Sequence, residues 1–188
     1  MTDGRLYPEE PAGSFPTPPA TVADREGRSI ELRTIDGGDA DDREALVEMY
    51  VRFDPTDRAQ GIPPTGEDRV RDWIETIAPE GIHVVAVHEG EVAGHATLVP
   101  ESDDPEAIEE PAGITWELAI FVLAAYQQAG IGTHLLEHLL GHAEGLGVER
   151  VWLTVERWNA PAIGLYESVG FERCGTESFE QEMAIRLA

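Results

Sequence analysis

Hydrophobic residues recur with helical spacing in two early segments of the chain, residues 41–53 and 66–77. In each segment the apolar positions fall three or four residues apart, which places them on one face of a helix. The pair Pro63–Pro64 lies between the segments and breaks the helical pattern. Ahead of both helices, apolar runs at 20–23 and 29–35 flank a polar turn and predict a β-hairpin.

The second half of the chain alternates strand patterns with helix patterns. Strands are predicted over residues 83–88, 92–99, 114–123, 148–155, 171–174 and 179–187. Helices are predicted over 133–144 and 159–169, and Gly145 and Gly147 end the first of them. This order predicts an α+β fold in which helices cover a mixed, mostly antiparallel sheet. We expect one domain over residues 21–188, preceded by a flexible segment rich in Pro and Glu, residues 1–20.

The stretch from Gln127 to Thr133 joins an apolar strand to an amphipathic helix and contains Gly130 and Gly132. The first N–H groups of a helix have no acceptor within the helix, and the helix dipole adds partial positive charge there. Glycines let a phosphate approach the backbone closely. The stretch therefore predicts an anion site, although a glycine pair alone has low specificity.

Two sequence blocks resemble the GCN5-related N-acetyltransferase (GNAT) family. The family's acetyl-CoA loop reads Gln or Arg, two residues, Gly, any residue, then Gly or Ala, and Gln127, Gly130 and Gly132 fit it. The family's second block is matched by Asn159, Ala162, Tyr166, Gly170 and Phe171. The resemblance covers residues 30–187 and implies the GNAT fold with acetyl-CoA as cosubstrate. The hairpin and the string at 116–122 further resemble the Pat-type protein lysine acetyltransferases.

The resemblance also implies which residues contact acetyl-CoA. The backbone of Phe121 and Val122 is expected to pair with the pantetheine amides, as an added strand would. The pyrophosphate is expected on the loop of Gln127, Gln128, Ala129, Gly130, Ile131, Gly132 and Thr133. Asn159, Ala162 and Tyr166 are expected beside the pantetheine arm.

Glu117 is the expected general base. A carboxylate within an apolar strand is costly unless it faces a cleft or is paired, and burial would raise its pKa toward a useful value. In the resembled family a Glu on this strand often deprotonates the amine. The alternative is a rim carboxylate that faces solvent or pairs with an arginine.

Tyr166 is the expected general acid. It lies seven residues after Asn159, so the two side chains share one helix face, which points at the cofactor in the resembled family. A phenol can protonate a departing thiolate. The alternatives are a core aromatic role for Tyr166 and a helix N-cap role for Asn159.

The loop itself offers no cation for a phosphate. Many relatives carry Lys or Arg just before the first loop glycine, where this chain has Ala129. No arginine occurs between Arg71 and Arg150. We therefore expect backbone N–H groups, the helix dipole and the Thr133 hydroxyl to hold the pyrophosphate, with a protonated His134 as a supplementary cation.

His134, His138 and His142 recur every four residues, a spacing that a metal site could use. The opposite helix face carries the leucines, so we expect these histidines on the outer face and no metal. Cys174 is the one cysteine, which excludes an internal disulfide. We interpret it as a buried structural thiol, with an acetyl-cysteine route as the minor alternative.

The net charge of the chain indicates the kind of environment in which the protein works. The chain has 37 acidic and 13 basic residues, a net charge of −24, and every basic residue is arginine. Concentrated salt relieves self-repulsion of this size, so we predict a cytoplasmic protein of a halophile, with recruitment of cationic partners as the alternative. We expect no nucleic-acid partner, since no basic patch exists, and no membrane partner, since no apolar run is long enough.

The resemblance implies an N-acetyltransferase that moves acetyl from acetyl-CoA to a primary amine by direct attack. The acceptor is a protein lysine, an N-terminal amine or a small amine, and the enzyme is a monomer or homodimer. The alternative is a non-catalytic acyl-CoA sensor on the same scaffold, which would need neither Glu117 nor Tyr166.

Overall fold

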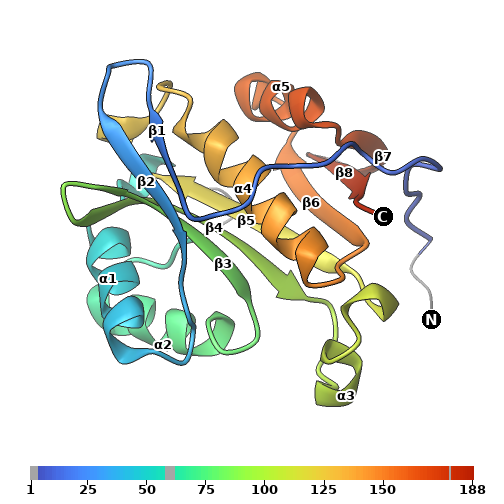
Figure 1. Ribbon diagram of the computed structural model, residues 1–188, viewed down its shortest axis with the longest axis horizontal. Helices are drawn as coiled ribbons and strands as arrows, with labels where there is room; N and C mark the ends of the chain where they lie inside the picture. The colour runs from blue at the N-terminus through green and yellow to red at the C-terminus, as the bar shows by residue number, and fades with distance from the viewer. Residues whose placement is uncertain (1–3, 58–61, 178) are drawn as a thin grey trace.

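The computed structural model describes residues 4–57, 62–177 and 179–188. Within them, eight strands form one sheet in the order β1-β2-β3-β4-β5-β6-β8-β7 (Figure 1). The strands are β1 (Ala20–Ala23), β2 (Ser29–Thr34), β3 (Ile82–His88), β4 (Glu91–Pro100), β5 (Trp116–Val122), β6 (Arg150–Glu156), β7 (Glu172–Glu177) and β8 (Glu180–Arg186). Neighbouring strands are antiparallel except β5 and β6, which run parallel.

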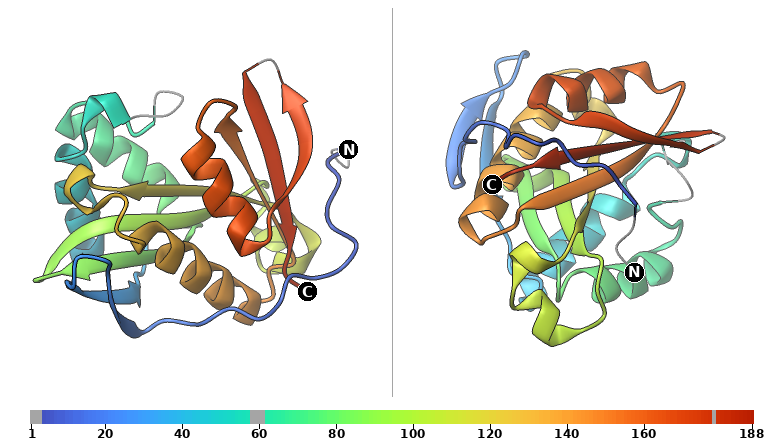
Figure 2. Two further views of the ribbon diagram at one scale, coloured as in Figure 1. Left: turned by 90° about the horizontal axis from the view of Figure 1, so that it is seen from above. Right: turned by 90° about the vertical axis from the view of Figure 1, so that its right-hand side faces the viewer.

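Helices cover both faces of this sheet. They are α1 (Ala40–Val51), α2 (Glu67–Ile77), α3 (Pro105–Ile108), α4 (Ile131–Gly145) and α5 (Ala160–Val169). Figure 2 shows α1 and α2 on one side of the sheet and α4 on the other. Alternate residues of β3 follow this division: Val84 belongs to the core under α4, and Val85 belongs to the core under α1 and α2. The α+β fold with a mostly antiparallel sheet is therefore as predicted.

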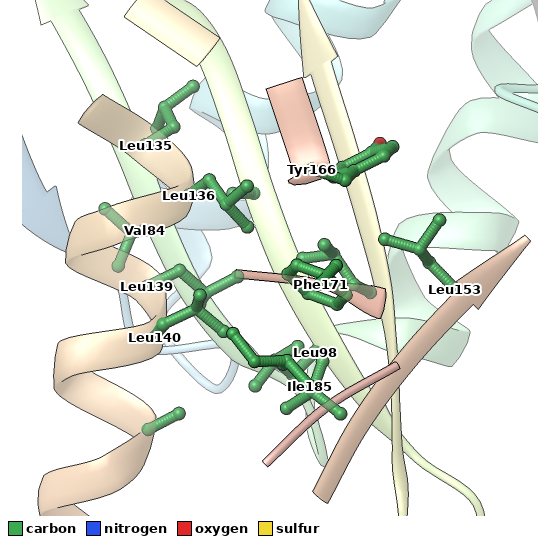
Figure 3. Packing of buried hydrophobic residues seen from close by; sticks show 14 of the residues in the cluster. Val84, Leu98, Leu135, Leu136, Leu139, Leu140, Leu153, Tyr166, Phe171 and Ile185 are labelled. Atoms are coloured by element: carbon green, nitrogen blue, oxygen red, sulfur yellow. The ribbon is translucent and has the colours of Figure 1, made fainter. Parts of the chain in front are cut away.

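The core under α4 is built from the leucines that the sequence pattern placed on one helix face. Leu135, Leu136, Leu139 and Leu140 are fully buried. Tyr166 and Phe171 lie between these leucines and Leu153 of β6 (Figure 3). This packing fixes α5 against α4, so it also fixes the face of α5 that carries Asn159 and Tyr166.

The pairing of β5 with β6 is short. Trp116 pairs with Val151 and Glu117 pairs with Trp152, and no further pair joins these strands. Beyond that point β5 stays paired with β4 while β6 stays paired with β8. The two halves of the sheet therefore turn away from each other, as the left view of Figure 2 shows.

The Pro-rich N-terminal segment, which we expected to be flexible, makes contacts in its described part. The Ala12 N–H donates to the Arg186 carbonyl at 2.7 Å. A Cβ added to Gly141 of α4 would clash with the Pro16 carbonyl oxygen, so the segment lies directly on that helix. Near its start, the Arg5 guanidinium lies 3.5 Å from the centre of the Trp152 ring.

Most predicted element boundaries agree with the structure within two or three residues. The largest shift concerns β7, which ends at Glu177 instead of residue 174. Helix α4 begins at Ile131 instead of residue 133, with Gly130 as its N-cap. The acidic loop after β4 contains the short helix α3, which we did not predict because the loop is rich in charged residues. Among the described residues, no helix is long and apolar enough to cross a membrane.

Candidate active site

A cleft of about 270 Å³ opens where β5 and β6 separate. Its floor is β5 from Glu117 to Val122, and its far wall is β6 with the first turns of α5. The segment after α1 closes the near side through Phe53, Asp57 and Ile62. The cleft therefore exists because the sheet splits, and it exposes the edge of β5 that has lost its partner strand.

Glu117 lines this cleft at the end where β5 still pairs with β6. It remains open to solvent, yet the surrounding protein raises the pKa of its carboxyl, first by burial and then through the charge of Glu101. The positive charge of Arg5 acts in the opposite direction. The ion pairs that Arg5 forms with Glu101 and Glu182 place its guanidinium near enough for its charge to act on Glu117.

Tyr166 lines the same cleft from α5. Its ring is buried and packs edge-on against Phe171, with 5.7 Å between the ring centres. Burial raises the pKa of its phenol to about 12, which keeps the hydroxyl protonated at neutral pH. Tyr166 is thus both a core aromatic and a cleft residue, so its packing role leaves a role in the cleft possible.

Asn159 and Ala162 complete the α5 side of the cleft. The Asn159 side-chain oxygen accepts a hydrogen bond from the Ala162 N–H at 3.3 Å and caps the helix. The N-cap alternative is therefore correct, and it does not compete with a cleft role because the same side chain lines the cleft. The cap fixes the orientation of this amide relative to Tyr166.

The glycine loop has the geometry of an anion cradle. Gly130 is left-handed, with φ of 87°, and Gln128 also has a positive φ of 59°. The first N–H that returns to the helix is that of His134, which donates to the Gly130 carbonyl. The N–H groups of Ile131, Gly132 and Thr133 therefore have no acceptor within the helix.

The side chain of Gln127 lies along the floor of the cleft. It donates to the Val122 carbonyl at 3.0 Å and to the Asp57 carboxylate at 3.2 Å. These bonds tie the glycine loop to the end of β5 and to the segment after α1. Phe121 and Val122, the expected partners of a pantetheine arm, lie on the same floor.

Comparison with known proteins decides which family this geometry represents. Residues 43–171 match the family model described as the acetyltransferase (GNAT) family. The chain belongs to the GNAT acetyltransferase family. This match spans both cleft walls and the glycine loop, so the resemblance drawn from the two sequence blocks is confirmed.

Among curated GNAT relatives, the chain is 48% identical over 58 residues to the [ribosomal protein bS18]-alanine N-acetyltransferase of Escherichia coli (strain K12). That match covers 29% of this chain and 39% of the relative. It is 33% identical over 171 residues to the mycothiol acetyltransferase of Acidothermus cellulolyticus, covering 86% of this chain and 49% of the relative. The chain thus spans less than half the length of either relative.

Among solved structures, the GNAT domain of S. lividans PAT is similar to this chain with a TM-score of 0.73. The similarity covers 89% of this chain and 96% of that domain, at 20% sequence identity. This level of identity shows that the two share the GNAT fold, and the fold class predicted from the sequence is confirmed.

The structure corrects our expectation that no arginine lies near the glycine loop of this GNAT domain. The β1–β2 hairpin brings Arg25 onto the loop, where the Arg25 N–H donates to the Ala129 carbonyl at 2.9 Å, and it brings Arg28 onto Ala125 just before the loop. Ala129 itself is buried, so it contributes its backbone alone. No local sequence pattern predicts this contact, because Arg25 precedes the loop by about a hundred residues.

The structure also corrects the placement of the three helical histidines. His138 is buried, and its Nδ1 lies 2.7 Å from the His134 carbonyl, so the row does not lie on an open outer face. Among the described residues, no group of three or more His, Cys, Asp or Glu side chains could hold a metal ion. Cys174 is half-buried, and burial followed by the charge of Glu182 raises the pKa of its thiol.

Proposed function

We propose that this protein is an N-acetyltransferase that transfers the acetyl group of acetyl-CoA to a primary amine by direct attack. The observation that carries this proposal is that Glu117, Asn159 and Tyr166 line one cleft, although they come from β5 and α5. Membership of the GNAT family and its N-acetyltransferase relatives support the reaction class.

The cofactor is proposed to enter where β5 and β6 diverge. The pantetheine arm would pair with the free edge of β5 at Phe121 and Val122, as a short added strand. Its pyrophosphate would lie on the N–H groups that open α4, from Gly130 to Thr133. Asn159 and Ala162 would flank the arm from the opposite wall.

Glu117 is proposed to accept a proton from the incoming ammonium. An alkyl amine has a pKa of about 10.4, so it arrives protonated and cannot attack until that proton is removed. The raised pKa of Glu117 makes the carboxylate a better base than an ordinary surface glutamate. The amine then forms a bond to the thioester carbonyl carbon, and the carbon–sulfur bond breaks as the tetrahedral intermediate collapses. The nitrogen loses its second proton in this step, and that proton ends on the departing thiolate.

Tyr166 is proposed to hold its proton toward the departing sulfur. A phenol with a pKa of about 12 is a weaker acid than a thiol of about 8.5, so the thiolate is stabilised mainly through the hydrogen bond. Burial of the phenol keeps the donor protonated in every turnover. The products are the acetylated amine and coenzyme A.

The acceptor is proposed to be a cationic amine, with a protein lysine or N-terminal amine favoured over a small molecule. Asp57, Glu117 and Glu156 line the cleft, and no described arginine does. Such a lining attracts ammonium groups and repels carboxylates. One relative named above acts on a protein alanine and the other is named for mycothiol, so both acceptor classes belong in the test.

The assay that tests this proposal follows release of coenzyme A in molar KCl, with peptide amines and small amines as acceptors. We expect turnover with at least one peptide amine, and Glu117→Gln should lower kcat by about 10²-fold or more while acetyl-CoA binding stays near normal. Glu172→Gln, an exposed residue of β7 outside the cleft, is the matched control. Tight acetyl-CoA binding without turnover of any amine would instead indicate a non-catalytic acyl-CoA sensor.

The net charge of −24 supports a cytoplasmic setting with concentrated salt as part of the same proposal. Folding that improves with added KCl, followed by far-UV circular dichroism, would support it. Full stability in dilute buffer would contradict it.

A further inference from the structure

The β1–β2 hairpin packs on the glycine loop in a fixed way. The Arg25 N–H donates to the Ala129 carbonyl at 2.9 Å, and one guanidinium nitrogen of Arg25 lies 3.5 Å from the Gln128 carbonyl. Its Nε lies only 3.7 Å from the position that a Cβ on Gly130 would take. The guanidinium therefore lies against the residue that caps α4.

Arg28 anchors the hairpin in this position. Its Nε donates to the buried Asp24 carboxylate at 2.7 Å, its Nη1 donates to the Ala125 carbonyl at 3.0 Å, and its guanidinium lies 4.4 Å from the Tyr126 ring centre. Burial opposes ionisation of Asp24, but hydrogen bonds from Arg28 and Glu26 outweigh it and hold the pKa of that carboxyl below its ordinary value. The Asp24–Arg28 ion pair therefore holds the turn of the hairpin in place against Ala125.

Arg25 differs from Arg28 in having no carboxylate partner. No acidic side chain of the described residues forms an ion pair with it, and it is exposed. What sets Arg25 apart from other exposed arginines is its position, because its guanidinium lies against the Gln128 carbonyl and Gly130 of the glycine loop. Arg28 orients the turn, and Arg25 is left with its charge available beside the cradle.

We propose that Arg25 binds a phosphate group of coenzyme A, supplying from the N-terminal hairpin the cation that the glycine loop lacks. This inference rests on the proposed function, because it assigns a residue to the same cofactor site. The phosphate is either the pyrophosphate at the start of α4 or the 3′-phosphate of the adenosine. Both are anions that a guanidinium binds through charge-assisted hydrogen bonds.

The test measures binding of coenzyme A and of 3′-dephospho-coenzyme A by calorimetry, at two KCl concentrations, for four proteins. They are the wild type, Arg25→Gln, Arg25→Lys and the control Arg173→Gln, which removes an exposed arginine paired with Glu167. We expect Arg25→Gln to weaken coenzyme A binding about 5- to 10-fold, Arg25→Lys to recover part of the loss, and the control to bind as the wild type does.

The two ligands separate the two phosphates. If Arg25 binds the 3′-phosphate, Arg25→Gln will bind both ligands equally while the wild type prefers coenzyme A. If it binds the pyrophosphate, the variant will bind both ligands more weakly by the same factor. In steady-state assays the KM for acetyl-CoA should rise while kcat changes less than about twofold, since Arg25 is remote from the reacting atoms.

Two results would overturn the proposal in distinguishable ways. If the wild type binds coenzyme A and Arg25→Gln binds it equally well, with an unchanged circular dichroism spectrum, Arg25 is not a cofactor residue. If the wild type itself does not bind coenzyme A in concentrated salt, the cofactor site and the proposed function fail together.

Discussion

Glu117 and Trp152 are partners in the last pair that joins β5 to β6 before the two strands separate. Because paired residues on neighbouring strands lie on the same face of the sheet, the Glu117 carboxylate and the Trp152 ring share one surface. The Arg5 guanidinium stacks on that ring and forms ion pairs with Glu101 and Glu182. The expected base therefore lies beside a small charged network that the N-terminal segment completes.

This network predicts how the reaction depends on pH. Glu117 must be ionised to act as a base, and its pKa is raised by burial and by Glu101. The rate should therefore fall, as the pH is lowered, at a higher pH than an ordinary glutamate would give. Arg5→Gln removes a charge that lowers this pKa, so the acidic limb of the kcat/KM profile should move further up. An unchanged limb in Arg5→Gln, with the fold intact, would show that Arg5 does not act on the base.

Two substitutions of Tyr166 separate the contribution of its ring to packing from the contribution of its hydroxyl to the reaction. Tyr166→Phe keeps the ring that packs on Phe171 and removes only the hydroxyl, so we expect kcat to fall by about 10²-fold. Stability should change by less than about 1.5 kcal/mol. Tyr166→Ala removes the buried ring and should cost about 3–5 kcal/mol of unfolding free energy. Full activity of Tyr166→Phe would rule out the proposed hydrogen bond from the hydroxyl to the departing sulfur, and denaturant titration supplies the stability readout.

A buried chain of hydrogen bonds predicts loss of stability in mild acid. His83 Nε2 lies 3.0 Å from the Ala78 carbonyl, which can only accept, so His83 Nδ1 accepts from His95 Nε2 at 3.1 Å. His95 Nδ1 then accepts from the Tyr50 hydroxyl at 2.6 Å. Every proton in the chain points the same way, and each ring is neutral.

Burial lowers the pKa of both rings, and the nearby His83 lowers that of His95 further. The folded state therefore resists protonation, while the unfolded chain binds protons below its ordinary pKa of about 6.5. The contribution to stability is present above about pH 6.5 and is lost as the pH falls below it. Unfolding free energy measured against pH should show this decline, and it should be smaller in His95→Gln. A decline of the same size in that variant would assign it to other groups.

The absence of a side chain at Gly141 should determine whether the N-terminal segment can pack on α4. Alanine is the better helix former by about 1 kcal/mol, but its methyl group at this position would meet the Pro16 carbonyl oxygen. We expect Gly141→Ala to displace the segment and to speed its cleavage in limited proteolysis. Gly145→Ala in the last turn of α4 is the control, because nothing lies within 4 Å of the added methyl. Equal cleavage rates in the two variants would argue against this packing.

The sequence by itself determined most elements and the family. Helical spacing in residues 41–53 and 66–77, the glycine loop and the Asn159–Tyr166 block depend on neighbours within about ten residues, and such local patterns are visible in one dimension. The same blocks carried the cofactor and catalytic expectations for Gln127 to Thr133 and for Tyr166. The sequence also singles out Glu117, because a carboxylate is conspicuous within an apolar strand.

Tertiary structure decided what depends on contacts between distant segments. Arg25 lies beside Gln128 across 103 positions, and only the register of the hairpin on β3 brings them together. The burial of His138 depends on what packs around α4, and the place of Glu117 depends on where β5 and β6 stop pairing. The composition of the Pro-rich segment predicts that it cannot form a hydrophobic core of its own. The segment nevertheless packs on α4, because Gly141 has no side chain at the point where the Pro16 carbonyl lies. Such contacts follow from the assembled layers, so no local pattern in the chain could have specified them.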